Sequence, residues 1–161
     1  MERMERAILR DVNLAEVRPK AAPAKNPVDH WTQAVLLERA AYLRKLAKNG
    51  NGSASETLKE YPRHIAVLCY RSRSGEAEMH ERFADLFCVL AGSATLMTGG
   101  VVEGARPAGP GETRGQSIVG GTEQKLRAGE FVHVPAAIPH QMLLTGDETI
   151  AYLAMQVQEI L

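Results

Sequence analysis

From His64 onward the chain consists of short apolar runs that glycines interrupt, and this pattern constrains the fold more than any other feature. The runs are HIAVLCYR, LFCVLAG, ATLMTGGVV, QSIVGGTEQKL, EFVHVP and TIAYLAMQV, with HQMLL as a weaker addition. Gly-Gly pairs at 99–100 and 120–121 predict tight turns. Because no helical pattern separates the runs, they predict an all-β fold, an antiparallel sandwich or barrel.

The segment before this region has a different character. Residues 1–26 are a charged stretch followed by an Ala/Pro/Lys-rich linker, and residues 27–63 hold a helical pattern and a connecting segment. Asn26 as a cap, Pro27 in the first turn and Gly50 at the end predict a helix near 28–48. We therefore expect an N-terminal arm, a helix packed on the barrel, and a barrel domain over residues 64–161.

The predicted helix carries one apolar face. Its members recur at helical spacing: Trp31, Val35, Ala40, Leu43 and Ala47. A partner helix of helix-turn-helix type does not follow, which argues against a DNA-binding regulator.

Composition narrows the classes of function. Lys plus Arg number 19 and Asp plus Glu number 19, so the basic excess of a nucleic-acid-binding protein is missing. No apolar stretch approaches the ~20 residues that span a bilayer, and the first residues lack the apolar core of a signal peptide. Cys69 and Cys88 lie in apolar runs without CxxC spacing, which favours buried thiols. We expect a cytoplasmic protein that contacts neither membranes nor nucleic acids.

The stretch EGARPAGPGETRGQ, residues 103–116, is rich in Gly and Pro and predicts a long loop. Long loops in compact domains are often binding loops. Glu112 and Arg114 are therefore weak candidates for substrate contacts, and the alternative is that both are exposed loop residues.

The stretch SGEAEMHERFADLFCVLAG, residues 74–92, places three polar side chains beside an apolar strand. Glu78 and His80 are two apart, so on a strand they share a face. Asp85 heads the next strand, where a carboxylate is costly to bury unless it is paired or binds a cation. The alternatives are a solvated Glu78 beside an arginine and an ion pair of Asp85 with Arg82 or another arginine.

The stretch GEFVHVPAAIPHQMLL, residues 129–144, contains a second polar candidate. Pro135 ends one strand, and Pro139–His140 begins the next, HQMLL. The fixed φ angles of these two prolines stiffen the approach of the His140 imidazole. Such stiffness suits a metal ligand, and the alternative is a buried or surface histidine. His133 lies in mid-strand and has no such context.

These two stretches resemble the two motifs of the cupin superfamily, G-x5-H-x-H-x3–4-E-x6-G and G-x5-P-x-G-x2-H-x3-N. In the first, His80 and Gly92 match, Asp85 replaces the glutamate, and Glu78 replaces the first histidine. In the second, Gly129, Pro135 and His140 match, Ala137 replaces the glycine and Leu144 the asparagine. The resemblance covers roughly residues 64–158.

The resemblance implies a double-stranded β-helix, a jelly-roll-type antiparallel barrel, with a divalent metal inside it. Carried over residue by residue, the metal ligands would be Glu78, His80, Asp85 and His140. Aspartate is one methylene shorter than glutamate, so Asp85 either ligates or acts through a water. The mixed N/O set suits Fe, Mn, Ni or Zn.

Two classes of function follow from the resemblance. One is a metal-dependent oxygenase, isomerase or lyase acting on a small oxygenated molecule, with Glu78 or Asp85 as candidate catalytic base. The other is a non-catalytic module that binds or senses a small ligand. We further expect a homodimer, because a small barrel has open sheet edges that proteins cover.

Overall fold

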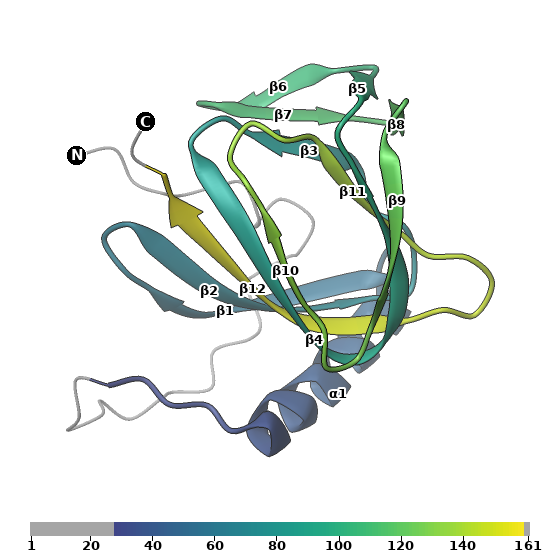
Figure 1. Cartoon of the computed structure of the whole chain (residues 1–161). Coiled ribbons are helices and arrows are strands. Elements are labelled where there is room, and N and C mark those ends of the chain that lie inside the picture. The colour runs from purple at the N-terminus through teal and green to yellow at the C-terminus, as the bar shows by residue number, and fades with distance from the viewer. Residues whose placement is uncertain (1–27, 160–161) are drawn as a thin grey trace.

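The structure is a computed structural model that describes residues 28–159 (Figure 1). One helix precedes a succession of antiparallel strands within this part of the chain. The elements are α1 Gln33–Asn49, β1 Ser53–Glu60, β2 His64–Arg71, β3 Ala77–His80, β4 Phe83–Thr98, β5 Val101–Glu103, β6 Arg106–Gly109, β7 Glu112–Gly115, β8 Ser117–Val119, β9 Thr122–Arg127, β10 Phe131–Val134, β11 His140–Leu143 and β12 Ile150–Gln158. The all-β prediction is confirmed, and each of the apolar runs lies largely in strands.

Ten of the described strands form one curled sheet in the order β1-β2-β12-β4-β11-β3-β7-β6, with β9 and β10 also pairing with β4. The strands β5 and β8 pair with each other in a separate two-stranded sheet. The long strand β4 makes the curl possible, because its first half pairs with β12 and β10 and its second half with β11 and β9. Between the halves Gly92 has a φ of 77°, a left-handed conformation that glycine adopts without strain. The sheet closes around an interior that Figure 1 shows nearly end-on.

The barrel interior is filled by the inward positions of alternating strands. Asp85, Phe87 and Val89 face inward along β4, as the sequence predicts, while Leu90 packs on the outside. The buried interior cluster consists of Ile65, Val67, Cys69, Phe87, Val89, Ala94, Leu96, Leu126, Val134, Met142, Ile150, Tyr152 and Ala154. Both cysteines are free thiols.

Helix α1 covers the outer face of the sheet formed by β1, β2 and β4 (Figure 1). It begins later than predicted, because the Thr32 hydroxyl accepts a hydrogen bond from the Val35 N–H and caps the helix there. Asn26 and Pro27 lie outside the described residues. The buried face of the helix consists of Leu36, Ala40, Leu43 and Ala47. The prediction that Val35 belongs to this face is wrong, because its side chain is 42% exposed.

Two segments differ from their predicted structure. Residues 103–116 are not one long loop, because β6 and β7 form a hairpin across Pro110 and Gly111. Pro107 is tolerated in β6 because β6 is the edge strand, where a missing N–H removes little pairing. The other segment is β1, SASETLKE, whose polar composition predicted no strand although it pairs along β2.

Within residues 28–159, no helix has both the length and the apolar character to cross a membrane. The homodimer and the cytoplasmic location stay predictions.

Candidate functional site

Strand β3 lies between β11 and β7, and its register brings residues distant in sequence side by side. Glu78 lies opposite His140 of β11, and also opposite Arg114 of β7. His80 lies opposite Glu112. Directly opposed residues in an antiparallel pair have neighbouring side chains, so this register assembles the site.

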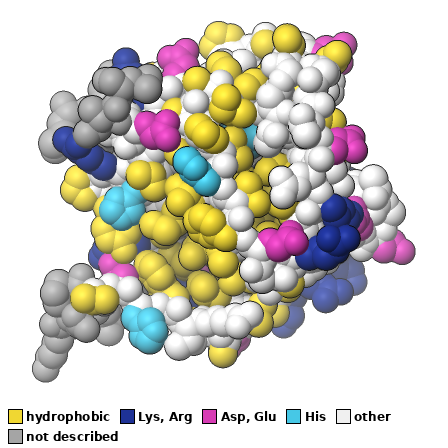
Figure 2. Space-filling view, viewed as in Figure 1, with side chains coloured by type: hydrophobic (Ala, Val, Ile, Leu, Met, Phe, Trp, Pro, Cys, Tyr) yellow, Lys and Arg dark blue, Asp and Glu magenta, His cyan; other side chains and the backbone are white. Residues whose placement is uncertain are grey.

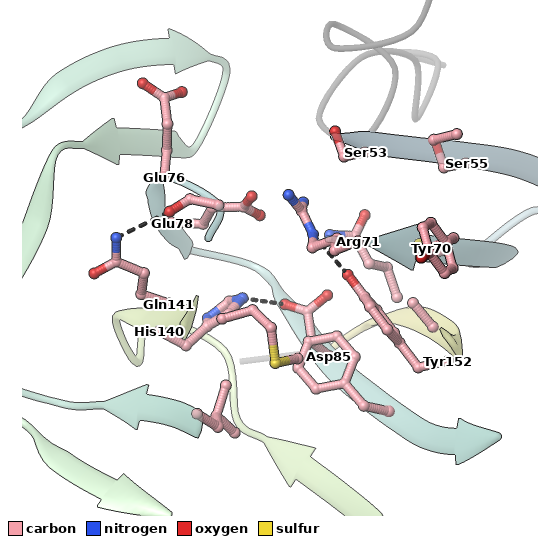
Figure 3. Close-up of a pocket in the computed structure, with 18 of the residues that line it drawn as sticks. Ser53, Ser55, Tyr70, Arg71, Glu76, Glu78, Asp85, His140, Gln141 and Tyr152 are labelled. Atoms are coloured by element: carbon pink, nitrogen blue, oxygen red, sulfur yellow. Dashed lines mark hydrogen bonds and ion pairs between the residues drawn. The ribbon is translucent and has the colours of Figure 1, made fainter. Parts of the chain in front are cut away.

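The side chains of Glu78, His80 and His140 converge inside the barrel. Their donor atoms all lie within 4.8 Å of one another. The His80 Nε2 lies 3.5 Å from the Glu78 Oε2 and 3.6 Å from the Asp85 Oδ2, and the His140 Nε2 lies 3.5 Å from the same Asp85 oxygen. Asp85 thus contacts both imidazoles, and Figure 3 shows its carboxylate beside the His140 ring, with a dashed line joining the two.

The spacing of these donors fits a divalent metal. Two ligand atoms that each lie ~2.1 Å from an ion are separated by roughly 3.0–3.4 Å in octahedral or tetrahedral geometry. The separations of 3.5–3.6 Å between the histidine nitrogens and the oxygens of Glu78 and Asp85 are close to this range. Imidazole nitrogens with carboxylate oxygens are donors that Zn, Fe, Mn and Ni accept.

Hydrogen bonds orient the donor atoms. The Nδ1 of His140 donates to the Ile138 carbonyl at 3.2 Å, which directs its Nε2 toward the cluster. The Gln156 amide lies 3.2 Å from the His80 Nε2. His140 therefore has the second contact on its far nitrogen that metal ligands commonly have. The Gln156 amide, by contrast, lies against the His80 nitrogen that faces the carboxylates, so it must move aside for His80 to bind a metal through Nε2.

The charge states of the carboxylates differ. Burial raises the pKa of Glu78, but its hydrogen bond with His80 and the nearby Arg114 charge outweigh burial and lower the pKa to about 2. Burial raises the pKa of Asp85 above its ordinary value, and the two histidines only partly oppose this. Glu78 is therefore fully ionised at neutral pH.

Arg114 holds the carboxylates of the site in place. Its Nη1 lies 3.2 Å from the Glu78 Oε1 and its Nε donates to the Glu112 Oε1 at 3.1 Å. Because Arg114 occupies Oε1, the second oxygen of Glu78 faces His80. Arg114 and Glu112 are 8% and 7% exposed, so the alternative of an exposed loop is wrong for both.

A pocket opens from this cluster toward the end of β2. Its polar lining includes Arg71, Tyr152, Gln141 and the serines of β1, which Figure 3 labels. Its apolar lining includes Phe87, Leu96 and Met142. Figure 2 shows hydrophobic side chains gathered over the middle of the face seen in Figure 1, with histidines among them.

Comparison with known proteins identifies the fold. No protein-family model matches the sequence. No curated protein matches it either. Among solved structures, the protein TT1209 from Thermus thermophilus is similar at a TM-score of 0.54 and 16% identity, over 76% of this chain and 93% of that one.

Two further solved structures have the same architecture. An uncharacterized Klebsiella pneumoniae protein with a double-stranded β-helix domain matches at a TM-score of 0.50 and 14% identity, over 66% of this chain and 76% of that one. A predicted oxalate decarboxylase from Thermotoga maritima matches at 0.50 and 12% identity, over 66% and 81%. The chain has the cupin fold.

The cupin barrel brings together each residue that the two motifs singled out: Glu78, His80, Asp85 and His140. Asp85 pairs with the histidines rather than with Arg82 or another arginine. Glu78 pairs with Arg114, not with the neighbouring arginines of its own segment. His133 lies on the outside of the barrel, 3.8 Å from Glu159.

Sequence reasoning missed other polar residues of this cupin pocket. Tyr152 and Gln156 occupy the inward positions of β12, two residues apart on each side of Ala154. Arg71 continues the inward series of β2 that includes Cys69. A period of two across these apolar strands is the signal that could have found them.

Proposed function

We propose that this protein is a metal-dependent cupin that acts on a small oxygenated molecule, in a reaction of the oxygenase, isomerase or lyase type. The observation that carries the proposal is the convergence of Glu78, His80 and His140 on one point inside the barrel. The enzyme function of the similar Thermotoga maritima protein, a predicted oxalate decarboxylase, is consistent with such a role.

In this proposal Glu78, His80 and His140 hold the metal, and Asp85 ligates it directly or through a water. A bound divalent metal supplies Lewis acidity, which polarises an oxygen of the ligand. Arg114 and Glu112 keep Glu78 oriented, so they are positioning residues. The weak expectation that they contact the substrate directly stays a prediction, and Arg114 does line the pocket.

Asp85 is the better candidate for a proton acceptor or donor in the site. Burial raises the pKa of Asp85, and a raised pKa lies closer to neutral pH, where a carboxyl can both take up and release a proton. Glu78, with a pKa of about 2, is a weak base and a good ligand.

A non-catalytic binding module is the second candidate, and one observation favours it. Arg114 already contacts both Glu78 and Glu112 directly, so the polar cluster can persist as an ion-pair network without a metal. Such a barrel would bind a small ligand and transform nothing.

Metal analysis of protein purified without a polyhistidine tag separates these candidates. We expect one equivalent of a divalent transition metal in the wild type and loss of stoichiometric metal in His80→Ala and His140→Ala. His133→Ala, which removes an exposed histidine, is the matched control and should keep the metal. Wild-type protein that takes up no divalent metal would favour the binding module, and screening with small oxygenated substrates then tests catalysis.

A further inference from the structure

Arg71 brings a positive charge into the pocket beside the metal-type cluster. It is the last residue of β2 and occupies an inward position of that strand. Its Nε donates to the Tyr152 hydroxyl at 3.1 Å, which fixes the direction of the guanidinium. Figure 3 shows the guanidinium projecting into the pocket between Glu78 and the serines of β1.

Among residues 28–159, no carboxylate forms an ion pair with the terminal nitrogens of Arg71. Tyr152 does not neutralise it, because burial raises the pKa of that phenol above its ordinary value. Cys69 does not either, because burial raises the pKa of its thiol to about 11. The charge of Glu78 acts on Arg71 without a direct ion pair, so the half-buried guanidinium keeps donors that a bound anion can use.

The other arginine that lines the pocket and the Gln141 amide are already engaged. Arg114 contacts Glu78 and Glu112, and the Gln141 amide donates to the carbonyls of Gly75 at 2.9 Å and Gln116 at 3.1 Å. Arg71 is therefore the cation of the pocket with donors to offer.

Gly75 leaves the space that the guanidinium occupies. A Cβ added at this position would lie 2.9 Å from the Arg71 Nη1 and 3.1 Å from its Cζ. Any side chain at residue 75 must therefore displace the guanidinium. The arginine conformation therefore depends on the lack of a side chain at Gly75, in the connection from β2 to β3.

We propose that Arg71 anchors the carboxylate of a small monoanionic ligand whose other end reaches the Glu78–His80–His140 cluster. The carboxylate anchor depends on Arg71 alone. The contact of the other end of the ligand with the cluster rests on the proposed metal function. One guanidinium fork matches one carboxylate. A phosphate dianion fits poorly, because Glu78, Asp85 and Glu112 already place negative charge around the site and Arg71 supplies a single positive charge.

Isothermal titration calorimetry with glycolate tests this inference, using the full-length protein both metal-free and loaded with Mn²⁺. Glycolamide, the neutral twin of glycolate, and inorganic phosphate are the comparison probes. Metal content is measured separately for each variant, and a thermal melt checks its fold. The variants are Arg71→Gln and Gly75→Ala, and Arg73→Gln is the matched control because Arg73 is exposed.

We expect glycolate to bind the wild type and Arg71→Gln to weaken binding about tenfold or more, the loss of a charged hydrogen-bonding pair. Gly75→Ala should also weaken it, because it displaces the guanidinium while keeping the charge. Arg73→Gln should match the wild type. Glycolamide and phosphate should bind more weakly than glycolate.

The inference is overturned if glycolate shows no saturable binding, if Arg71→Gln binds it like the wild type, or if glycolamide binds equally well. Tighter binding of phosphate than of glycolate overturns the choice of carboxylate. If the protein takes up no metal but Arg71→Gln still abolishes glycolate binding to the metal-free form, the proposed metal function fails and the anchor role of Arg71 stands.

Discussion

The backbone N–H of Ala137 donates a hydrogen bond to the carbonyl of His80 at 2.8 Å, and so joins the two motif stretches of the site. Ala137 has a φ of 63°, in the left-handed region that costs a residue with a Cβ about 1–2 kcal/mol. It stands where the second cupin motif has glycine. The chain therefore stores strain next to its candidate metal centre.

Ala137→Gly should stabilise the protein by roughly 0.5–1 kcal/mol, since relief of strain exceeds the entropy cost of glycine. Thermal unfolding should show a rise in Tm of about 1–4 °C. Ala136→Gly is the control, because Ala136 lacks the positive φ and should lose stability. Equal effects of the two substitutions would contradict the strain assignment.

Metal affinity should fall as the pH is lowered, because a protonated imidazole cannot ligate. Burial lowers the pKa of His80, but its hydrogen bond with Glu78 and the charges of Asp85 and Glu112 outweigh burial and raise it. Protons therefore begin to compete with the metal for His80 at a pH above the ordinary histidine pKa of about 6.5, and they compete more strongly as the pH falls further. Titration of metal at a series of pH values measures this, and a pH-independent affinity between about 8 and 6 would contradict it.

Saturating metal should also raise the unfolding free energy, by about 2.7 kcal/mol when its concentration is 100 times the Kd. Calorimetric melts with and without metal measure this in the wild type. In His140→Ala the added metal should leave the melt unchanged. His133→Ala should respond like the wild type, since His133 lies outside the barrel.

The Arg114 contacts give a separate stability prediction. Arg114→Met leaves Glu78 and Glu112 without their cation and should cost about 3–5 kcal/mol, the usual effect of breaking a buried pair. It also removes a charge that lowers the pKa of Glu78, so that pKa should rise. Urea unfolding measures the first effect and NMR titration of the carboxyl the second.

Arg106→Met is the matched control for Arg114. Arg106 pairs with Glu76 at 2.7 Å, but its side chain is 52% exposed, so the pair is worth about 0–1 kcal/mol. Similar losses in the two variants would mean that Arg114 acts through packing rather than through its charge.

The sequence determines some of these features locally and others only through the fold. The strands beside the site were predictable because each has its own alternation and its own glycine turn, and the spacing of His80 from Asp85 needs no long-range information. The Arg114–Glu78 pair was not predictable from the sequence, because it depends on the register between β3 and β7. The strand β7 lies in a segment whose glycines and prolines predict a loop.

The start of the helix and strand β1 show the same limit. The sequence pattern by itself predicts an earlier start, whereas Thr32 caps α1 and the helix residues Leu36 and Leu43 pack on the sheet. Ser53–Glu60 has weak strand propensity and is held by pairing with β2. Tertiary contacts override local preference in both segments.

Glu148 should make the protein more sensitive to acid. Its carboxylate accepts hydrogen bonds from Lys125, from the Thr145 N–H at 3.1 Å and from the Ser93 hydroxyl at 3.1 Å, and these contacts lower its pKa to about 2. Because the folded pKa is below the unfolded value of about 4.3, this stabilisation is complete above the unfolded value and is lost as the pH falls toward 2.

Glu148→Gln should therefore unfold more easily than the wild type at pH 7, and the difference should shrink as the pH approaches 2. Denaturant melts at several pH values measure this. Glu123→Gln is the control, because Glu123 is exposed on β9 and has no such set of donors among the described residues. A Glu148→Gln penalty that does not change with pH would contradict the charge-based account.

Gly92 is the residue on which the curl of the barrel depends most directly. A Cβ at this position would lie 1.9 Å from the Thr149 carbonyl oxygen, and that oxygen accepts the Ser93 N–H at 2.9 Å. Gly92→Ala must therefore separate β4 from the segment entering β12, and its cost should exceed the ~1–2 kcal/mol of a left-handed alanine. Gly99→Ala isolates that conformational cost, since Gly99 has a φ of 74° but nothing within 4 Å of the added Cβ. Expression and thermal unfolding of the two variants should show a folded Gly99→Ala and a severely destabilised Gly92→Ala; equal stabilities would mean that β4 can bend without the close contact at Thr149.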